Sequence, residues 1–442
     1  MSARIFGHYC AAEAIALFSL EALAMVGAIG FTLIAIALDH AAARPSLLAQ
    51  GVGVLLAFEL SLYVCDLHDI GTATSDGRRG GRLLRAIGGA AAAVGLCAWV
   101  RPMPSGRGLD LLVVAVAAAS VILARWLYLA RLRRPRRVLL VGSGARAAAI
   151  HRAVEGDLGG RFTIVDQWED PRLEDLSRGL SLSQADVVVV ASDDRRGLSP
   201  TALLAARLRG IAVLEAAQFI ERVERRIPLE LIRPGDLAFA EGPVWNRTRK
   251  ALKRGFDLLA GSLLLVFAAP VMCLVALAVR MGSKGPVFYR QERLGRDGKP
   301  YTLVKFRTMR VDAELATGPV WAQQRDPRVT RVGAFLRRAR LDELPQLFNV
   351  LEGSMSLVGP RPERDFFAAQ VRAKVPLFDL RLAAKPGVTG WAQLRYPYGA
   401  SIEDARAKLE LDLYYLKNGS PFLDLVIAFH TAKHVLLGRG SR

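Results

Sequence analysis

Two adjacent carboxylates, Asp342 and Glu343, lie in the stretch of the chain best suited to chemistry. They precede Pro345, which suits the first turn of a helix, and Gly353, which suits a helix end. The apolar residues between these two points recur at helical spacing: Leu344, Leu347, Phe348 and Leu351. We therefore expect the acid pair at a helix N-terminus, where the backbone dipole stabilises anions. An ordinary pair of capping acids is the alternative.

The composition around this pair restricts the chemistry. Between Gly242 and Phe429 the sequence has no histidine, and its one cysteine, Cys273, lies in an apolar run. Catalysis by Ser–His or Cys–His pairs and a His/Cys zinc site are therefore excluded from this region. Carboxylates, arginines and lysines remain, which is typical of phosphoryl transfer assisted by a divalent metal.

Cations are concentrated in two nearby places. Two strands joined at Asp297-Gly298, a strong turn signal, carry a basic cluster: Arg290, Arg293, Arg296, Lys299, Lys305 and Arg307. Further on, two prolines restrict the backbone around Arg361 in the loop 359–362. That restriction reduces the entropy lost when a guanidinium grips a phosphate. The alternative is that this loop is only a rigid surface turn, and the loop considered alone would favour that interpretation.

Residues 138–241 have the pattern of a Rossmann-like α/β domain, with strands predicted near 138–141, 185–194 and 211–217. Gly142, Gly144 and Ala147 fit the G-x-G-x-x-A turn, and Asp166 follows at the distance of a ribose-binding acid. The domain contains no catalytic tyrosine–lysine pair. We therefore expect a nucleotide-binding fold kept for regulation or assembly, with a possible nucleotide-binding turn at the two glycines.

Apolar stretches at about 11–37, 46–65, 86–100 and 111–130 predict a four-helix transmembrane domain over 1–131. Arginines concentrate in the second loop and after the last stretch, at Arg78, Arg79, Arg82 and Arg85, then Arg131, Arg133, Arg134, Arg136 and Arg137. By the positive-inside rule both chain ends face the cytoplasm. Three carboxylates fall within these stretches: Glu13, Glu21 and Glu59. They are either functional groups of the membrane domain or carboxylates that are paired or packed between its helices.

A fifth apolar segment, 256–281, is long enough to cross a bilayer, yet it has basic residues at both ends. Pro270 near its middle removes one helical hydrogen bond and clashes with the preceding turn. We expect a re-entrant helix that enters and leaves on one face. The alternative is a kinked span with the C-terminal part outside the cell.

The whole composition agrees with a membrane protein, because 52% of residues are hydrophobic while the formal charge is +19. The basic residues flank apolar spans and are not interleaved with aromatics, so we expect no nucleic-acid partner. The four cysteines, Cys10, Cys65, Cys97 and Cys273, lack metal-ligand spacing and indicate a reducing context.

Four sequence blocks then occur in order: KFRTM (305–309), LDELPQLFNVLEGSMSLVGPRP (341–362), KPGVTGWAQL (385–394) and LELDLYYLKN (409–418). Together they resemble the bacterial polyprenyl-phosphate sugar-1-phosphate transferases, from about Lys250 to the C-terminus. The preceding spans and Rossmann-like domain resemble the long form of that family, and RYPYGASIEDARAKLELDLYYLKN resembles its exopolysaccharide-associated members. Where the family has Ser-Pro at the membrane break, this chain has Ala269-Pro270.

The resemblance implies a monotopic α+β phosphoglycosyl transferase domain over 246–442 in the bacterial inner membrane, with its active site facing the cytoplasm. Asp342 would attack the β-phosphate of a UDP-sugar, forming a phosphosugar-aspartate and releasing UMP, and polyprenyl (undecaprenyl) phosphate would then displace the enzyme. Glu343 would assist as base or metal partner, with Mg²⁺ held by the acid pair. The other roles implied are phosphate binding by Lys305, Arg307, Arg361 and Arg293, and sugar or nucleotide contacts by Thr389, Trp391 and Gln393. Further partners would be a second copy of the chain and polysaccharide-assembly proteins.

Two other classes stay open at this point. A nucleotide-sugar dehydratase or reductase would use the Rossmann-like domain but needs the missing tyrosine–lysine pair. A non-catalytic scaffold of polysaccharide assembly would not need LDELP together with GPRP. We also expect a chain starting near Asn246 to keep some activity, because the middle domain lacks catalytic partners.

Overall fold

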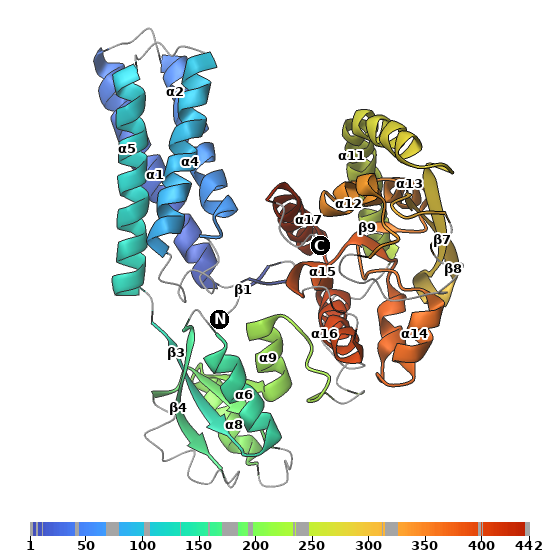
Figure 1. The fold of residues 1–442 in the computed structure, drawn as a ribbon. Helices are drawn as coiled ribbons and strands as arrows, with labels where there is room; N and C mark the ends of the chain where they lie inside the picture. Colours follow the sequence, from blue (N-terminus) through green and yellow to red (C-terminus); the bar gives the residue numbers. More distant parts are fainter. Residues whose placement is uncertain are drawn as a thin grey trace. The chain divides into compact units, whose positions relative to one another are not determined.

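A computed structural model gives the fold (Figure 1). It describes residues 3–5, 8–10, 12–39, 44–67, 79–100, 107–132, 134–157, 160–169, 184–192, 198–232, 235, 247–311, 313, 326–396, 399 and 401–437. The chain forms two compact units, unit 1 (1–3 and 10–223) and unit 2 (4–9 and 224–442). Two short strands, β1 (Ala3–Ile5) and β2 (His8–Cys10), pair near the start of the chain.

Unit 1 begins with a bundle of four helices: α1 (Ala12–Asp39), α2 (Arg44–Val64), α4 (Arg79–Val100) and α5 (Arg107–Leu127), which continues as a π-helical turn, η2 (Tyr128–Leu132). Their shared core includes Met25, Phe58 and Val121, all fully buried. Large apolar side chains also face outward, Leu23 and Leu56 among them. Helices that are apolar all round are typical of a membrane or of a larger core.

Membrane crossing is supported for part of this bundle. Among the described residues, the stretch 112–130 and the later helix over 247–282 are long and apolar enough to span a bilayer. Two shorter apolar helices occur at 16–30 and 51–64. The prediction of a mixed helical and sheet protein with apolar helices is confirmed, whereas four membrane spans stay a prediction.

One of the predicted intramembrane carboxylates has a clear partner. Glu21 is fully buried and forms an ion pair with Arg125 of α5. Arg125 Nη2 also donates to the Leu67 carbonyl at 3.1 Å. The Arg125 guanidinium therefore joins three segments of the bundle and pairs the Glu21 charge, which favours the packing alternative for Glu21. The side chain of Glu13 lies outside the described residues.

An α/β sheet completes unit 1. Its four parallel strands are ordered β4-β3-β5-β6. The strands are β3 (Arg136–Val141), β4 (Phe162–Trp168), β5 (Val187–Val190) and β6 (Ala212–Glu215), with helices α6 (Ala145–Glu155), α8 (Pro200–Leu208) and α9 (Ala216–Glu224).

The glycine turn of this sheet follows β3. Gly142 has φ 122°, and a Cβ there would lie 2.6 Å from the Ser192 backbone nitrogen, so a side chain is excluded. Gly144 also has a positive φ of 85° and precedes α6. Asp166, the expected ribose acid, accepts the Trp168 indole N–H at 2.8 Å. The acid is thus already engaged, and nucleotide binding by this turn stays a prediction.

Unit 2 surrounds a mixed core of helices and short strands. A hairpin of β7 (Phe288–Leu294) and β8 (Pro300–Phe306) turns through η4 (Arg296–Gly298), where Asp297 and Gly298 have positive φ, as predicted. The helices are α11 (Arg247–Gly282), α12 (Arg331–Arg338), α13 (Gln346–Glu352), α14 (Asp365–Arg372), α15 (Trp391–Arg395), α16 (Ile402–Asn418) and α17 (Pro421–Leu436). Strands β9 (Ser356–Val358) and β10 (Gly387–Thr389) pair in parallel, and η5 (Leu341–Glu343) and η6 (Phe378–Ala383) are 3₁₀ turns.

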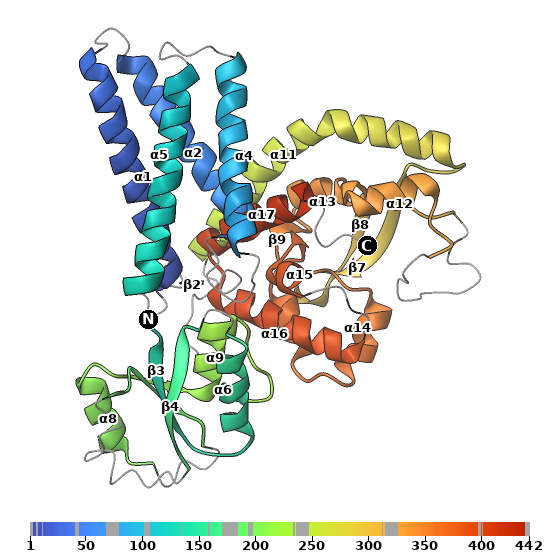
Figure 2. The ribbon, with the colours of Figure 1, turned by 60° about the vertical axis from the view of Figure 1, so that its left-hand side comes forward.

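Helix α11 is attached to unit 2 near both ends. Near its start, Arg254 donates to the carbonyls of Val350 and Leu351, each at 2.6 Å. Near its end, Val279 packs in a cluster with Phe306 and Leu336. The helix contains Pro270, and its ribbon changes direction along its length (Figure 2).

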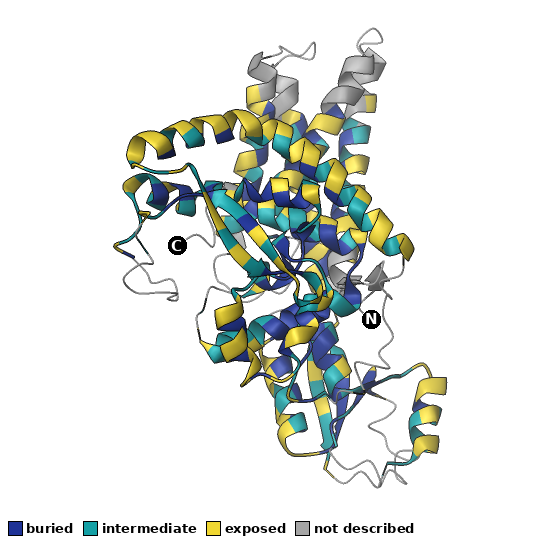
Figure 3. Ribbon diagram, turned by 90° about the vertical axis from the view of Figure 1, so that its right-hand side faces the viewer, coloured by how far each residue is buried: buried dark blue, intermediate teal, exposed yellow. Residues whose placement is uncertain are grey.

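The middle of α11 is largely exposed (Figure 3). Val266, Phe267 and Leu274 are 69%, 72% and 69% exposed. Large exposed apolar side chains in a row are typical of a surface that contacts lipid or another protein. Along the same stretch another face of the helix packs on the rest of unit 2, through the buried Met272 and Val275, so α11 has one apolar face inward and one outward.

The segment that follows α9 has its described contacts in unit 2, which includes residues from Glu224 onward. The domain bounds expected from the sequence, 138–241 and 246–442, stay a prediction. The Ile227 N–H donates to the Glu410 carbonyl at 3.0 Å, and the Trp391 indole N–H donates to the Arg225 carbonyl at 2.9 Å. The segment after α9 is thus part of unit 2.

This segment predicts a difference between two truncated chains. A chain starting at Glu224 should unfold at a higher temperature than one starting at Asn246, because the shorter chain leaves the Trp391 N–H without its acceptor and loses the buried Ile227. We expect a loss of at least ~2 kcal/mol, measured by thermal unfolding in detergent. In the longer chain, Trp391→Phe should reproduce part of the loss. Equal melting of the two truncations would contradict the assignment.

Candidate active site

The acid pair lies in η5, immediately before α13. Arg340, at the start of this turn, has a left-handed backbone with φ 54°. Helix α13 follows Pro345 and ends at Gly353, whose φ is 105°. Asp342 is buried at 9% exposure, and the Glu343 side chain is 14% exposed. The pair therefore precedes a helix as expected, but it occupies a separate 3₁₀ turn.

The site surrounds the two carboxylates with cations from three segments. Arg361 Nη2, from the loop after β9, donates to Glu343 Oε1 at 3.0 Å. Lys305 of β8 and Arg337 of α12 act electrostatically on Asp342. These contributions come from residues far apart in the chain, and only folding brings them together.

The two carboxylates differ in how well their charge is stabilised. Burial raises the pKa of Asp342, and the neighbouring Glu343 raises it further, against the opposing effects of Lys305, Arg337 and Arg361. Burial acts in the same direction on Glu343, but Arg361 and Lys305 outweigh it and hold the pKa of Glu343 below its usual value. Glu343 is thus a stable anion, whereas Asp342 is a desolvated carboxylate with less compensation. Such a division of two acids by their environments is typical of catalytic sites.

Lys305 is the cation most affected by this crowding. Burial lowers its pKa to about 8, with Arg361 and Arg293 acting in the same direction and Glu343 and Asp342 opposing them. Another anion placed beside Lys305 would stabilise its charged form. The site is therefore prepared electrostatically for a phosphate group.

Gln393 belongs to the same site through Arg361. The Arg361 Nη1 atom donates to the Gln393 Oε1 atom at 3.1 Å. The Arg361 side chain is 41% exposed, so it links the buried Glu343 to the surface. Of the residues proposed from the sequence, Asp342, Glu343, Lys305, Arg361 and Gln393 therefore lie together.

Arg293 and Arg307 have other contacts. Arg293 donates to the Pro362 carbonyl at 3.2 Å and to Gln291 Oε1 at 2.7 Å, beside the loop of Arg361. Arg307 is buried and donates to the carbonyls of Ser283 and Lys284, at 2.8 and 3.0 Å. It holds the carbonyls that follow α11, so the geometry does not favour our prediction of phosphate binding by Arg307.

Thr389 and Trp391 also contact structural partners. The Thr389 hydroxyl lies 2.7 Å from the Thr431 hydroxyl of α17. Trp391 is buried at 4% exposure and stacks on Tyr414 with ring centroids 5.9 Å apart. These contacts place both residues in the framework of unit 2, and their suggested sugar or nucleotide contacts stay predictions.

Sequence reasoning missed Arg337 and Arg381. Arg337 is one of five arginines between 328 and 340, and the sequence does not indicate which of them lies at the site: Arg328, Arg331, Arg337, Arg338 and Arg340. Arg381 is buried behind the loop of Arg361, as described below. Buried arginines have no reliable signal in a sequence this rich in Lys and Arg.

The carboxylate pair could hold a divalent cation. Within the described part of the chain, no group of three or more His, Cys, Asp or Glu forms a complete metal site. Mg²⁺, however, is commonly held by one or two carboxylates together with substrate phosphates. Asp342 and Glu343 fit that pattern, and the poorly compensated charge of Asp342 would be stabilised by a cation.

Comparison with known proteins gives the class of this chain. A sequence model of the family described as "Bacterial sugar transferase" matches residues 248–438, which include the acid pair and every cation of the site. The exopolysaccharide production protein PSS of Rhizobium leguminosarum bv. phaseoli is 42% identical over 189 residues, 41% of this chain and 92% of that protein. The chain belongs to the bacterial sugar transferase family.

Longer relatives share the same region. The UDP-N-acetylgalactosamine-undecaprenyl-phosphate N-acetylgalactosaminephosphotransferase of Aeromonas hydrophila is 37% identical over 259 residues, covering 58% of this chain and 60% of that protein. The UDP-glucose:undecaprenyl-phosphate glucose-1-phosphate transferase of Escherichia coli K12 is 46% identical over 184 residues, 41% of this chain and 39% of that protein. The matched regions thus span less than two thirds of these two relatives.

The contacts predict different roles for two arginines of the site region. Arg307→Ala should lower the free energy of unfolding by about 2–4 kcal/mol, because it leaves the carbonyls of Ser283 and Lys284 unpaired. Arg361→Ala should change it by less than ~1 kcal/mol, since the Arg361–Glu343 pair is partly exposed. Thermal unfolding of both variants in detergent tests this. A stable Arg307→Ala protein would mean that the guanidinium does not hold this segment.

Proposed function

We propose that this chain transfers a sugar-1-phosphate from a UDP-sugar to a polyprenyl phosphate such as undecaprenyl phosphate, releasing UMP. This would be the initiating step in the synthesis of an exopolysaccharide or another glycoconjugate. The observation that carries the proposal is the buried Asp342 beside an ion-paired Glu343, surrounded by cations inside the family match. The names of the relatives, which include glucose and N-acetylgalactosamine phosphotransferases, support it.

In the first step, an oxygen of the Asp342 carboxylate attacks the β-phosphorus of the UDP-sugar. The bond from this phosphorus to the bridging oxygen breaks, and UMP leaves with the bonding electrons. Asp342 then carries the sugar phosphate as a mixed anhydride. A carboxylate whose pKa is raised by burial is a stronger nucleophile than a solvated one, so the environment of Asp342 suits this role.

In the second step, an oxygen of the lipid phosphate attacks the same phosphorus and releases Asp342. The products are a polyprenyl-diphosphate-sugar and the free carboxylate. Lys305 and Arg361 would neutralise phosphate charge in both steps, and Glu343 would orient Arg361 through their hydrogen bond. Mg²⁺ held by the acid pair would add further neutralisation of phosphate charge when bound.

The membrane part of the proposal rests on α11. Both ends of this helix pack on the rest of unit 2. If the helix crossed the bilayer straight, unit 2 would have to lie on both sides of the membrane. We infer a re-entrant helix with Pro270 near its turn, in a multi-pass protein of the bacterial inner membrane. The active site would face the cytoplasm, where the UDP-sugar is, close to the lipid headgroups.

Other parts of the chain enter the proposal more generally. The helices of unit 1 would anchor the protein, and the α/β domain would serve regulation or assembly. A second copy of the chain and other polysaccharide-assembly proteins remain proposed partners.

The proposed nucleophile can be tested by one substitution. Asp342→Asn should reduce UMP release from a UDP-sugar by at least ~10²-fold, because the covalent step is lost. Luminescent detection of UMP with purified protein and undecaprenyl phosphate would measure this.

The matched control is Asp365→Asn, which changes an exposed acid of α14. Asp342→Asn should melt no lower than the unmodified chain, since burial and Glu343 disfavour the charge of Asp342 at neutral pH. Near-normal UMP release by a folded Asp342→Asn protein would refute the assignment.

The pKa of Lys305 predicts an alkaline limit. Because this pKa is about 8 in the free protein, Lys305 loses its charge as the pH rises through 8. The value of kcat/KM for the UDP-sugar should fall there, while kcat should fall at higher pH, because bound phosphates stabilise the ammonium form. Lys305→Arg should remove the fall in kcat/KM, since a guanidinium stays charged. An unchanged alkaline limit in Lys305→Arg would exclude Lys305 as its origin.

The topology of α11 can be tested with single cysteines. In a chain without its four native cysteines, Thr248→Cys and Lys284→Cys place one thiol at each end of the helix. With an impermeant thiol reagent, neither should react in intact cells and both should react after permeabilisation. Labelling of Lys284→Cys alone from outside would show that α11 crosses the bilayer.

A further inference from the structure

The loop that carries Arg361 is held at four successive backbone carbonyls. Two of its residues are prolines, so the loop has few N–H groups of its own and depends on donors from elsewhere. The donors are the Gly387 N–H to Pro360 at 2.9 Å, Arg381 Nη2 to Arg361 at 3.1 Å, Arg293 Nη1 to Pro362 at 3.2 Å and the Leu294 N–H to Glu363 at 3.0 Å. One of these donors, Arg381, is a buried side chain with an ion pair of its own.

Arg381 lies behind the loop and away from the acid pair. It is 5% exposed, and its guanidinium carbon lies 5.1 Å from the centre of the Phe378 ring. Its Nη2 atom lies 2.8 Å from Asp412 Oδ2, and its Nη1 atom lies 3.6 Å from Glu363 Oε1. Asp412 is 1% exposed, so the Arg381–Asp412 pair is almost completely removed from water.

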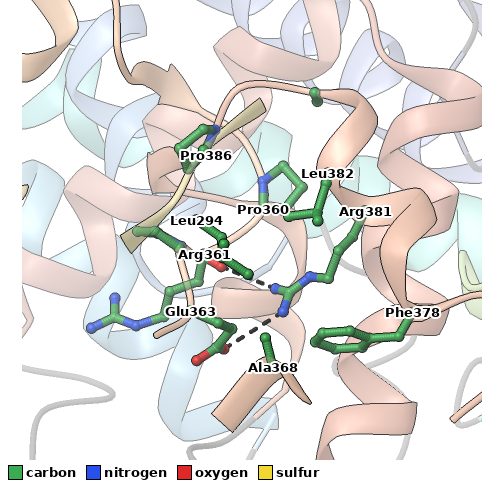
Figure 4. Close-up of a pocket in the computed structure, with 12 residues that line it drawn as sticks. Leu294, Pro360, Arg361, Glu363, Ala368, Phe378, Arg381, Leu382 and Pro386 are labelled. Carbon is green, nitrogen blue, oxygen red and sulfur yellow. Dashed lines mark hydrogen bonds and ion pairs between the residues drawn. The ribbon is translucent and has the colours of Figure 1, made fainter. Parts of the chain in front are cut away.

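A buried ion pair is weak evidence for stability, because desolvation offsets most of the attraction between the charges. The arrangement here has a specific geometric result. Figure 4 shows the Arg381 guanidinium directed at the Arg361 carbonyl, while the Arg361 side chain leads away on the other side of the loop. Arg381 therefore contacts the backbone from which the Arg361 guanidinium extends.

The position of that backbone determines where the Arg361 side chain can reach. Its two terminal nitrogens donate to Glu343 and to Gln393, at 3.0 and 3.1 Å. A displacement of the loop by about 1 Å would break both hydrogen bonds and move the guanidinium from its place beside the acid pair.

We propose that Arg381 and Asp412 are positioning residues: together they hold the backbone of Arg361 so that its guanidinium can bind the diphosphate of the nucleotide sugar. The role rests on the function proposed above. Arg381 and Asp412 touch neither of the two catalytic carboxylates in the described contacts, and they act through Arg361. Asp412 forms an ion pair with the Arg381 guanidinium, and the Phe378 ring lies against the face of that guanidinium.

An arginine is required at position 381 because one planar group serves three acceptors. The guanidinium donates a hydrogen bond to the Arg361 carbonyl and forms ion pairs with Asp412 and Glu363. A lysine has one ammonium group and cannot hold the same fork. Arg381→Lys therefore keeps the charge and removes the geometry, and Asp412→Asn keeps the shape and removes the charge that orients Arg381.

The test is a double-mutant cycle with Arg361. In the full chain, Arg381→Lys and Asp412→Asn should each weaken UDP binding, measured by calorimetry, and lower kcat/KM for the UDP-sugar, by ~10–100-fold. In an Arg361→Ala background the same two changes should have less than ~3-fold effect, because the side chain that they position is gone. Arg372→Lys, which alters the exposed Arg372–Asp379 pair, is the matched control and should change neither quantity.

Each outcome separates the alternatives. Equal losses with and without Arg361 would overturn the positioning role and show a general structural effect. Two variants are included because Arg381→Lys changes a buried group and could impair folding. A folded Asp412→Asn protein with unaltered UDP binding would also overturn the positioning role. Failure of the proposed function would appear differently, as an unmodified chain that releases no UMP, while the UDP-binding cycle still decides the role of Arg381.

Discussion

A charged group that is buried away from water must be stabilised by opposite charges or hydrogen bonds within the protein. The arrangement of the acid pair and its cations in unit 2 follows from this requirement. Glu343 keeps its charge because Arg361 and Lys305 oppose the effect of burial, whereas burial, together with the cationic neighbours Arg361 and Arg293, lowers the pKa of Lys305. Of the two adjacent carboxylates, Asp342 is the less compensated one. In the proposed first step this carboxylate would become part of a mixed anhydride, which would move the charge from Asp342 to phosphate oxygens beside Lys305 and Arg361.

The same requirement connects the site to the apolar helix. Lys253 of α11 donates to Asp424 of α17 at 2.8 Å, and the Tyr415 hydroxyl donates to the other oxygen of Asp424, also at 2.8 Å. Asp257, one turn further along α11, accepts hydrogen bonds from Ser356 and Leu357 at the start of β9. Strand β9 leads directly into the loop of Arg361. The apolar helix is therefore linked through buried polar contacts to the strand that precedes the Arg361 loop.

Local features of this unit could be predicted from the sequence, and distant partnerships could not. Asp297-Gly298 forms the expected turn and Gly353 ends α13, because backbone conformation depends on the residue itself. Lys305 and Arg307 share one motif, yet the first contributes to the site and the second holds the end of α11. Likewise, the buried Trp391 indole N–H donates to the Arg225 carbonyl, 166 residues away in the sequence. Periodicity and turn residues carry no information on such contacts.

The attachment of α11 has a consequence for biosynthesis. Its partners lie far along the chain: Arg254 bonds carbonyls 96 and 97 residues later, and Lys253 pairs with Asp424 after 171 residues. When α11 leaves the ribosome, none of these partners has been made, and the membrane meets an apolar segment with basic residues at both ends. Its final placement must therefore wait until α17 has been synthesised and packed. In the proposed re-entrant topology, the orientation of this helix would therefore depend on the folding of the domain that follows it, and a chain that stops before α17 would lack the Lys253–Asp424 pair that holds its start.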